Sequence, residues 1–529
     1  MSPRLEVLST TAHEWRWASL GAAALLGAYV ALSGSSPRLV LEIAVAVAYM
    51  LFAARCLREP LFFLLVYVVA LEIFPPLYRP RHEETPIYLA LALFPVGVSV
   101  AAGRFQDMHF TWDPLAKGLA VFLLGTGCSL PFAFWLSGNQ TGMESLARWL
   151  LLAQMGYLFY LIRAGAHRKE TTTERLVYPL LLIGAALSAG YGIVDFIWPV
   201  PLPHPTPNQY IWLGTGVVRR AQGVFYDSMN FANFAAIFLV IASAAFLAKR
   251  HRSLGAARWG LVPLIAVLCL AVLVSFARST GAAIAVALLV FGLRTGMVKT
   301  RRLLALCLAL AVPFLLLWMF SPDLWRYFLS ARVETLADIL SHPNDATSGR
   351  YETWFRVLDI IRENPQYLIF GIGYKTLNQT RLFHGGIIVD NGYLSLLLET
   401  GLAGLAGFLV FSTALLRTFA RLSRRAENHP SPLFPRLISR SREGGNPVVS
   451  NLTPALRLRG GDSGSGKDSV AFWSAVMLSL WVGELVQLLA VDAYTFWRNM
   501  VILVALMALT LNRAERLAGS PEPLRGEHP

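Results

Sequence analysis

Long apolar stretches, separated by short polar segments, follow one another along most of the chain. Each holds about 17 to 22 residues, enough for a helix to cross the hydrocarbon core of a bilayer. The pattern predicts an all-α integral membrane protein with about 14 transmembrane helices. The predicted spans are 18–33, 39–55, 61–76, 86–102, 114–136, 147–163, 177–197, 231–248, 259–276, 279–293, 303–320, 391–416, 471–489 and 496–512.

The basic segments between spans predict the orientation. Segments 163–175, 249–258 and 294–302 are rich in Lys and Arg and alternate with segments poorer in them, which places these three in the cytoplasm. By alternation both termini are cytoplasmic, and the loops 198–230 and 321–390 face outward.

The remaining polar segments complete the predicted organisation. The outward loop 321–390 contains two stretches with helical apolar spacing, 322–340 and 350–364, which predict a helical lid at the membrane interface. In the second, Tyr351, Trp354, Phe355, Leu358 and Ile361 share a face. The predicted division is helices 1–11 in 1–320, the outward loop 321–390, helix 12 at 391–416, a basic flexible cytoplasmic loop at 417–470, helices 13–14 at 471–512 and a tail at 513–529.

Composition agrees with this class and excludes others. Hydrophobic residues make up 55% of the 529 residues and charged residues only 15%, which is typical of a membrane protein. The net charge of +14 comes mostly from loops between spans, so we expect no nucleic-acid partner. The four cysteines lie in or beside apolar stretches without a CxxC spacing, which predicts neither disulfides nor a metal site.

Polar residues that gather at the outward membrane boundary are candidates for function, because charges there are costly. Arg219 and Arg220 precede a span and are followed by Asp227, Asn230 and Asn233. The two arginines suit an anion, although snorkelling to lipid phosphates is an alternative.

Arg278 lies in SFARSTGAA, a tight reversal between two apolar helices. A phosphate-bearing ligand would neutralise it, assisted by Ser279, Thr280 and the following helix N-terminus; a salt bridge to a neighbouring helix is the alternative. Arg350 falls in the first turn of the second lid helix, where a cation opposes the helix dipole. It is therefore a candidate to face a ligand, with a surface role as the alternative.

The stretch VDNGYLSLLLETGLAG, residues 389–404, places Asp390 and Asn391 at the head of an apolar helix. Asp390 suits either an N-cap or a general base, and His384 is a reserve candidate for the base. Glu399 is nine residues further on, roughly 13.5 Å along a regular helix and on the opposite face, which indicates a partner for another helix. The glycines predict close packing or a bend.

Three outward arginines and a lid predict a site for a polyanion at the membrane, such as a lipid-linked pyrophosphate. The sequence has no P-loop, G-x-S-x-G or HExxH motif, which disfavours hydrolases and ATP-driven pumps. We expect no metal and no cofactor.

Four motifs in register, RAQGVFYDSMNFANF, SFARSTGAA, SGRYETWFRVLDIIRENPQYLIFGIGY and DNGYLSLLLETGLAG, resemble the O-antigen ligase and Wzy-type polysaccharide polymerase superfamily over residues 215–417. The resemblance implies a GT-C-like glycosyltransferase in the bacterial inner membrane. Such an enzyme transfers a glycan from undecaprenyl pyrophosphate to an acceptor at the periplasmic face, without nucleotide sugar or metal. Arg220, Arg278 and Arg350 carry over as the residues that stabilise the pyrophosphate.

One position departs from the ligase pattern. The spacing holds through Asn391, Gly401 and Gly404, but Asp390 stands where ligases have His. This resembles the Asp-Asn variant of exopolysaccharide polymerases and implies polymerisation. The predicted catalytic residues are Asp390 and Asn391, and the predicted substrate-binding residues are Arg219, Arg220, Asn230, Arg278, Ser279 and Arg350.

The expected partners are an undecaprenyl-pyrophosphate-linked oligosaccharide, an acceptor glycan and the lipid bilayer. Two alternatives share this chemistry: ligation to lipid A-core, and O-oligosaccharyl transfer to protein. A transporter of a lipid-linked sugar or anion is a further alternative, disfavoured because the two halves of the chain show no internal similarity.

Overall fold

The computed structural model describes residues 60–73, 112–164, 172–198, 210–213, 216–225, 227–247, 260–295, 319, 350–377, 389–424 and 462–519. The described residues do not include the spans predicted at 18–33, 39–55 and 86–102, the predicted first lid helix or His384. Of the span predicted at 303–320 they include only residue 319. Within them, six helices are long and apolar enough to cross a membrane. The chain is therefore a mostly helical, multi-pass membrane protein; the total of about 14 spans and the GT-C-like arrangement stay predictions.

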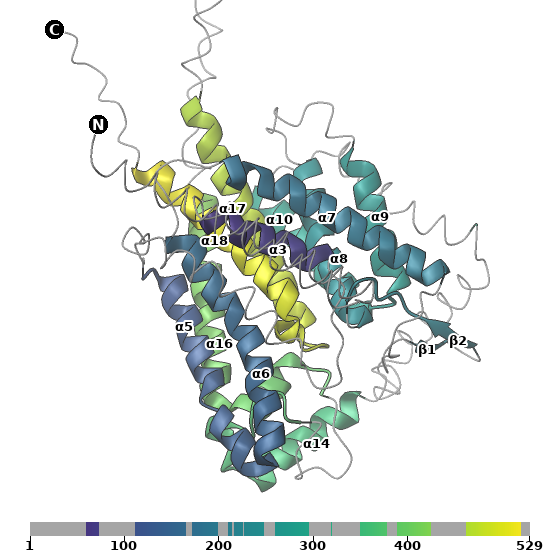
Figure 1. Ribbon diagram of the computed structural model, residues 1–529, viewed down its shortest axis with the longest axis vertical. Helices are drawn as coiled ribbons and strands as arrows, with labels where there is room; N and C mark the ends of the chain where they lie inside the picture. Colours follow the sequence, from purple (N-terminus) through teal and green to yellow (C-terminus); the bar gives the residue numbers. More distant parts are fainter. Residues whose placement is uncertain are drawn as a thin grey trace, which may run out of the picture.

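The described elements follow the chain in the order shown in Figure 1. They are α3 (Pro60–Ile73), α5 (Pro114–Gly127), α6 (Leu130–Ala164), α7 (Thr172–Ile197), β1 (Tyr210–Leu213), β2 (Gly216–Arg219), α8 (Ser228–Leu247), α9 (Leu261–Val274), α10 (Arg278–Thr295), α14 (Arg350–Glu363), α15 (Tyr367–Phe370), α16 (Gly392–Arg424), α17 (Asp462–Gln487), the 3-10 turn η5 (Ala493–Thr495) and α18 (Trp497–Gly519).

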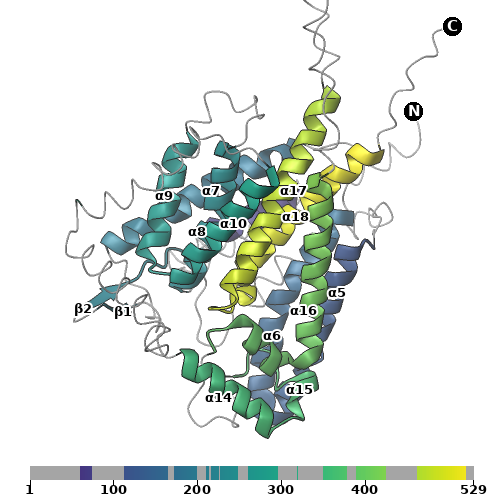
Figure 2. The same cartoon turned by 180° about the vertical axis from the view of Figure 1, so that it is seen from behind.

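Helices α5, α6 and α16 run alongside one another and reach further than α8, α17 and α18 at the end where α14 and α15 lie (Figures 1 and 2). Small residues allow the close contact between α5 and α16. A Cβ on Gly125 would lie 2.4 Å from the Ala403 carbonyl oxygen, and a Cβ on Gly407 would lie 2.9 Å from Phe122 Cα. The close packing predicted for the glycines of 389–404 is present at Gly404, whose Cα would lie 3.3 Å from a Cβ on Gly125.

The single span predicted at 114–136 is wrong, because two breaks interrupt the apolar stretch that continues into α6. Helix α5 ends at Gly127, and Ser129 donates its side-chain hydroxyl to the Thr126 carbonyl at 2.8 Å before α6 begins. A second break lies inside α6 at Gly138, with φ 85°, a left-handed conformation that glycine adopts without steric cost. Apolar content alone does not reveal such breaks.

The prediction of a purely helical chain also needs a correction. Strands β1 and β2 form an antiparallel pair in the loop between α7 and α8, with Tyr210 opposite Arg219. The hairpin ends directly before Arg220, one of the predicted substrate-binding residues.

The helix predicted at 350–364 is present as α14. Its Val357 is fully buried, in a cluster that includes Ile372 and Leu398, and this contact holds α14 against the start of α16. Three of the side chains predicted to share an apolar face, Tyr351, Phe355 and Leu358, are exposed. An exposed apolar face beside charged residues suits a membrane interface.

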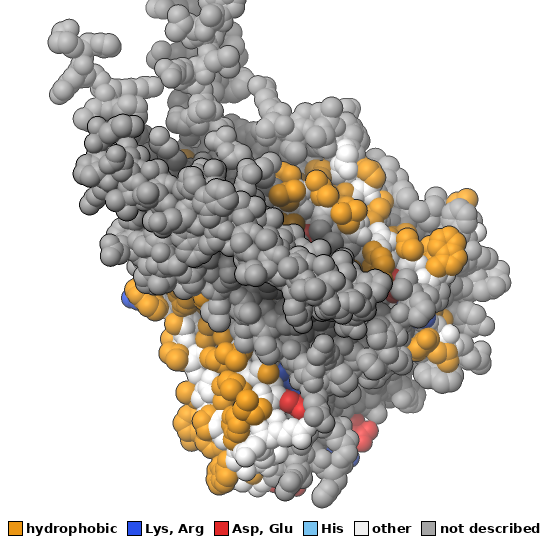
Figure 3. Space-filling model, viewed as in Figure 1, with side chains coloured by type: hydrophobic (Ala, Val, Ile, Leu, Met, Phe, Trp, Pro, Cys, Tyr) orange, Lys and Arg blue, Asp and Glu red, His pale blue; other side chains and the backbone are white. Residues whose placement is uncertain are grey.

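Large apolar side chains are also exposed along the long helices. In Figure 3 hydrophobic side chains cover much of the described surface of the part that contains α5 and α6. Among the exposed residues are Val121, Leu124, Leu187 and Leu293. Exposed apolar area of this extent is expected where helices face lipid.

Candidate functional site

The segment after β2 is bound to the junction between α9 and α10. Ala221 donates its backbone N–H to the Val274 carbonyl at 3.0 Å, and Arg220 donates from Nε to the Ser275 carbonyl at 2.8 Å. These two hydrogen bonds bring Arg220 beside the tight reversal that carries Arg278, although 58 positions separate the two arginines. The reversal predicted between two apolar helices is confirmed.

The reversal itself has an unusual backbone. Phe276 has a φ of 55°, a left-handed conformation that is disfavoured for a bulky residue. Strained positions of this kind persist only when the surroundings fix them, and they are frequent at functional sites. Arg278 follows as the first residue of α10 and is exposed, so its guanidinium lies at a helix N-terminus.

Arg350 and Asp390 form the next part of the site. Arg350 begins α14, and its Nε lies 2.9 Å from Asp390 Oδ2 just before α16. The two side chains are 22% and 34% exposed, so the pair is accessible from the solvent. Arg350 is therefore not a plain surface arginine, because it links the start of α14 to the start of α16.

These groups act on one another electrostatically. Burial, assisted by the charges of Arg278 and Arg350, lowers the pKa of Arg220 to about 10, whereas Asp227 and Asp390 act in the opposite direction. Arg220 therefore keeps its charge at neutral pH. Three guanidinium groups from separate segments share their surroundings with two carboxylates, which leaves an excess of positive charge in the described part of the site. We refer to Arg220, Arg278, Arg350, Asp227 and Asp390 as the arginine site.

The N-cap of α16 is Asn391, and not Asp390. Asn391 Oδ1 accepts hydrogen bonds from the backbone N–H groups of Tyr393 and Leu394, both at 3.1 Å. Its Nδ2 donates to the Leu489 carbonyl at 3.2 Å. Asn391 thus satisfies free donors of the first turn, as an N-cap does. Asp390 is available for another role.

The structure places the other predicted binding residues in different surroundings. Arg219 points to α7, where its Nη2 lies 2.9 Å from Asp195 Oδ1, so the structure does not bring it to the arginine site. Asn230 is buried in the first turn of α8, whose N-terminus is capped by Asp227 through a 2.7 Å bond from the Asn230 N–H. Ser279 is half-buried next to Arg278.

Glu399 lies at the end of a helical segment that stops at a bend. Gly401 has a φ of 67°, which interrupts the regular helix, and a loop packs against the backbone just before it. The N–H groups of Ile372 and Gly373 donate to the Leu398 and Glu399 carbonyls at 3.1 and 2.9 Å. The bend predicted for the glycines is confirmed. The Glu399 side chain is hydrogen-bonded by the Lys375 backbone in the loop that follows α15, and the charge of Arg148 on another helix, α6, acts on it.

Two charged residues at the site were missed by the sequence reasoning. Lys375 Nζ lies 2.7 Å from Asp492 Oδ2, and both belong to segments between helices. No pattern in the sequence indicates their pairing, since 117 residues separate them. Within the described ranges, no three His, Cys, Asp or Glu side chains come close enough to hold a metal ion.

A second polar cluster is buried between the helices. Asn233 Nδ2 donates to Glu484 Oε1 at 2.8 Å and lies 2.9 Å from Gln487 Oε1. Gln487 Nε2 lies 3.3 Å from Thr280 Oγ1, in the first turn of α10. This cluster fixes α8, α17 and α10 against each other behind Arg278.

One segment of the chain matches a known protein family. A family model described as O-antigen ligase matches residues 263–409. This segment is similar to the O-antigen ligase family. The match confirms the resemblance over three of the four motifs, and the first motif, at 220–234, lies outside the matched residues. No curated protein matches the chain.

The O-antigen ligase segment includes Arg278, Arg350, Asp390 and the bend at Gly401, whereas Arg220 and Asp492 lie outside it. The structure nevertheless bonds Arg220 to Ser275, which is inside the segment. The site is thus built around the O-antigen ligase segment and extended by residues on both sides of it.

Proposed function

We propose that this protein is a glycosyltransferase of the bacterial inner membrane that polymerises polysaccharide. It takes a glycan from undecaprenyl pyrophosphate and transfers it to an acceptor sugar at the periplasmic face. The observation that carries the proposal is the convergence of Arg220, Arg278 and Arg350, from three separate segments, beside Asp390.

The charge change of the reaction suits this group of arginines. A glycan-pyrophosphate-lipid carries one negative charge on each phosphate. Breaking the bond between the anomeric carbon and the phosphate oxygen leaves the bonding electrons on that oxygen, so negative charge develops on the leaving pyrophosphate. Fixed cations that meet this developing charge stabilise the transition state more than the ground state.

Asp390 supplies the proton acceptor in this scheme. The acceptor hydroxyl attacks the anomeric carbon and transfers its proton to the Asp390 carboxylate as the new glycosidic bond forms. The ion pair with Arg350 holds that carboxylate beside the cations that receive the pyrophosphate. Donor and acceptor would then meet where the starts of α14 and α16 come together.

Exposed apolar side chains on α14 support a lipid-linked substrate. Tyr351, Phe355 and Leu358 are exposed on the helix that begins with Arg350. A helix that lies on the membrane in this way keeps Arg350 at the depth of lipid phosphates. The proposal includes cytoplasmic chain termini, as the basic loops predict.

Ligation of the glycan to lipid A-core or to protein is the second candidate, because it uses the same donor and the same leaving group. The family match is described as O-antigen ligase, which favours it, whereas Asp390 at the position of the ligase histidine favours polymerisation. The acceptor decides between them.

The experiment is transfer by purified protein in nanodiscs with a defined undecaprenyl-pyrophosphate oligosaccharide, analysed by mass. Products that increase by whole repeat units on the lipid carrier support polymerisation. A mass increase on added lipid A-core or protein, with no such ladder, supports ligation. Movement of labelled donor across liposomes without any new glycosidic bond would contradict both and support a transporter.

A further inference from the structure

We propose that the ion pair of Lys375 and Asp492 is a positioning pair for the arginine site, which holds the start of α16 so that Asp390 faces Arg350. The expected effect of the pair on kcat rests on the proposed transferase function. Its effect on the position of α16 does not depend on that function. Neither residue is in the predicted site, and Asp492 lies outside the O-antigen ligase segment.

The pair joins two segments that are far apart in the sequence. Lys375 lies in the segment that follows α15, and Asp492 lies between α17 and η5. Their 2.7 Å contact is largely shielded, with side chains 23% and 17% exposed. Ser395, in the first turn of α16, donates its hydroxyl to the same Asp492 Oδ2 at 3.0 Å. One carboxylate oxygen therefore binds both the segment 371–377 and α16.

The Asp492 segment also holds the residues next to Asp390. Gly392 donates its N–H to the Leu488 carbonyl at 2.7 Å, and Asn391 Nδ2 donates to the Leu489 carbonyl. Asp390 lies one residue before Asn391 and two residues before Gly392. A shift of the segment 488–492 would therefore move the carboxylate that pairs with Arg350.

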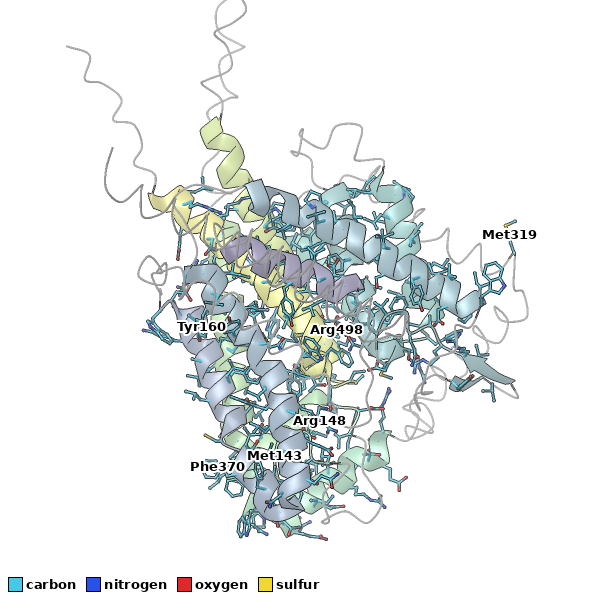
Figure 4. The ribbon with its side chains drawn as sticks, viewed as in Figure 1. Met143, Arg148, Tyr160, Met319, Phe370 and Arg498 are labelled. Atoms are coloured by element: carbon cyan, nitrogen blue, oxygen red, sulfur yellow. The ribbon has the colours of Figure 1, made fainter. Side chains whose placement is uncertain are left out.

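Lys375 is held in place independently of Asp492. Its backbone has a φ of 56°, which a lysine rarely adopts, and its carbonyl accepts a 2.6 Å bond from Arg148 Nη1 on α6. Figure 4 labels Arg148. The preceding Tyr374 carbonyl accepts from the Ser145 hydroxyl. The long helix α6 thus fixes the lysine, and the lysine fixes Asp492.

Lys375 also compensates a second carboxylate. Glu399 is buried, its Oε2 atom has no hydrogen-bond partner among the described residues, and the cations that act on it are Lys375 and Arg148. Removal of Lys375 would leave Glu399 with Arg148 and would leave Asp492 without its ion-pair partner at 2.7 Å. Removal of the Asp492 charge would leave Lys375 with Glu399. The two substitutions should therefore differ, and the loss should be greater for Lys375.

The test uses the full-length protein in nanodiscs with the variants Asp492→Asn, Lys375→Met and Lys375→Arg. Lys117→Met removes an exposed lysine from α5 and serves as the control. Hydrogen exchange is followed in peptides that cover residues 391–395, and kcat and KM are measured for the lipid-linked donor. The exchange measurement does not depend on any catalytic activity.

We expect Asp492→Asn to speed exchange of the Gly392, Tyr393 and Leu394 amides at least tenfold. It should lower kcat at least tenfold with KM for the donor changed less than threefold. Lys375→Met should have the larger effect, Lys375→Arg should restore kcat to within threefold of the wild type, and Lys117→Met should change neither quantity.

Unchanged exchange at 391–395 in Asp492→Asn would overturn the proposal, whatever happens to activity. So would a rise in donor KM as large as the fall in kcat, because the pair would then bind the donor. If Asp492→Asn does not fold, Lys375→Arg decides: activity as low as in Lys375→Met overturns the positioning role. Faster exchange in a protein whose wild type transfers no glycan would retain the positioning pair and refute the transferase.

Discussion

Two groups of arginines and carboxylates lie in different parts of the molecule, and they differ in charge balance. In one group Arg163 is 3% exposed as a side chain and is bonded to Asp113 Oδ2 at 2.9 Å, to Glu515 and to Asn512 Oδ1 at 2.8 Å. One cation there has two carboxylates and an amide. In the other group, the arginine site, three arginines share two carboxylates and Arg278 is exposed.

The difference shows how to distinguish an arginine that stabilises the fold from an arginine that can bind an anionic ligand. A buried guanidinium whose two Nη groups are bonded to protein side chains stabilises the contact between helices, in this case between α5, α6 and α18. Cations in excess of their carboxylates repel one another, and a ligand that neutralises them is bound more tightly. The first group predicts effects on stability, and the second predicts effects on transfer.

The largest effect is expected for Arg278→Ala. Loss of one fixed cation that meets the leaving pyrophosphate should lower kcat by about 10²- to 10³-fold, as for a missing transition-state donor. Because Arg278 is exposed, the melting temperature should stay close to that of the wild type. Transfer rates and thermal unfolding of the two purified proteins check this. Normal chain lengths in a complementation assay with this variant would contradict the assignment.

Asp390→Asn should follow, with a loss of about 10²-fold in kcat, because a missing general base costs typically 10²- to 10⁴-fold. The amide retains the shape of the carboxylate and a hydrogen-bond acceptor for Arg350. Expression and membrane insertion should be unchanged. Single-turnover rates with bound donor measure the step directly, and a rate equal to the wild type would remove Asp390 from the chemistry.

Arg163→Met should have the opposite profile. The substitution leaves Asp113 and Glu515 without their shared cation, and hydrogen bonds to charged groups contribute about 1.5–3 kcal/mol each, less where the partner is exposed as Glu515 is. We expect the free energy of unfolding to fall by about 1–3 kcal/mol. Activity per folded molecule should be within twofold of the wild type. A stable but inactive variant would abolish the contrast between the two groups.

The smallest effect is expected for Asn391→Ala. Loss of the N-cap bonds to Tyr393 and Leu394 should cost about 1 kcal/mol, and kcat should fall less than in Asp390→Asn. Asn391→Ser retains a capping oxygen and is the matched control. If Asn391→Ala loses as much activity as Asp390→Asn with unchanged stability, Asn391 acts on the substrate.

The sequence was sufficient for the elements that depend on local pattern. Apolar run length located α7, α8, α9, α10 and α18 to within a few residues of most of their bounds, and helical spacing located α14. It could not locate the breaks after Gly127 and at Gly138, because neither the end of α5 nor the left-handed backbone of Gly138 changes the apolar pattern.

The sequence identified site residues where a charged side chain is unfavourable in its local setting. Arg220, Arg278 and Arg350 stood out because a cation at an outward boundary or a helix N-terminus is poorly explained locally. The roles of Asp390 and Asn391 could not be separated in this way, since both are good caps and only the bond to Arg350 distinguishes them. No local sequence pattern marks Lys375 and Asp492, because their ion pair depends on a contact between distant segments.

Binding of undecaprenyl pyrophosphate to the intact protein tests the central claim most directly. The dissociation constant is measured in nanodiscs for the wild type, Arg278→Gln and Arg163→Gln, with undecaprenyl monophosphate as the competing lipid. Our account predicts weaker pyrophosphate binding by at least tenfold in Arg278→Gln, and unchanged binding in Arg163→Gln once the protein is folded. Equal affinity in all three proteins would contradict it, because the arginine site would then not be where the pyrophosphate binds.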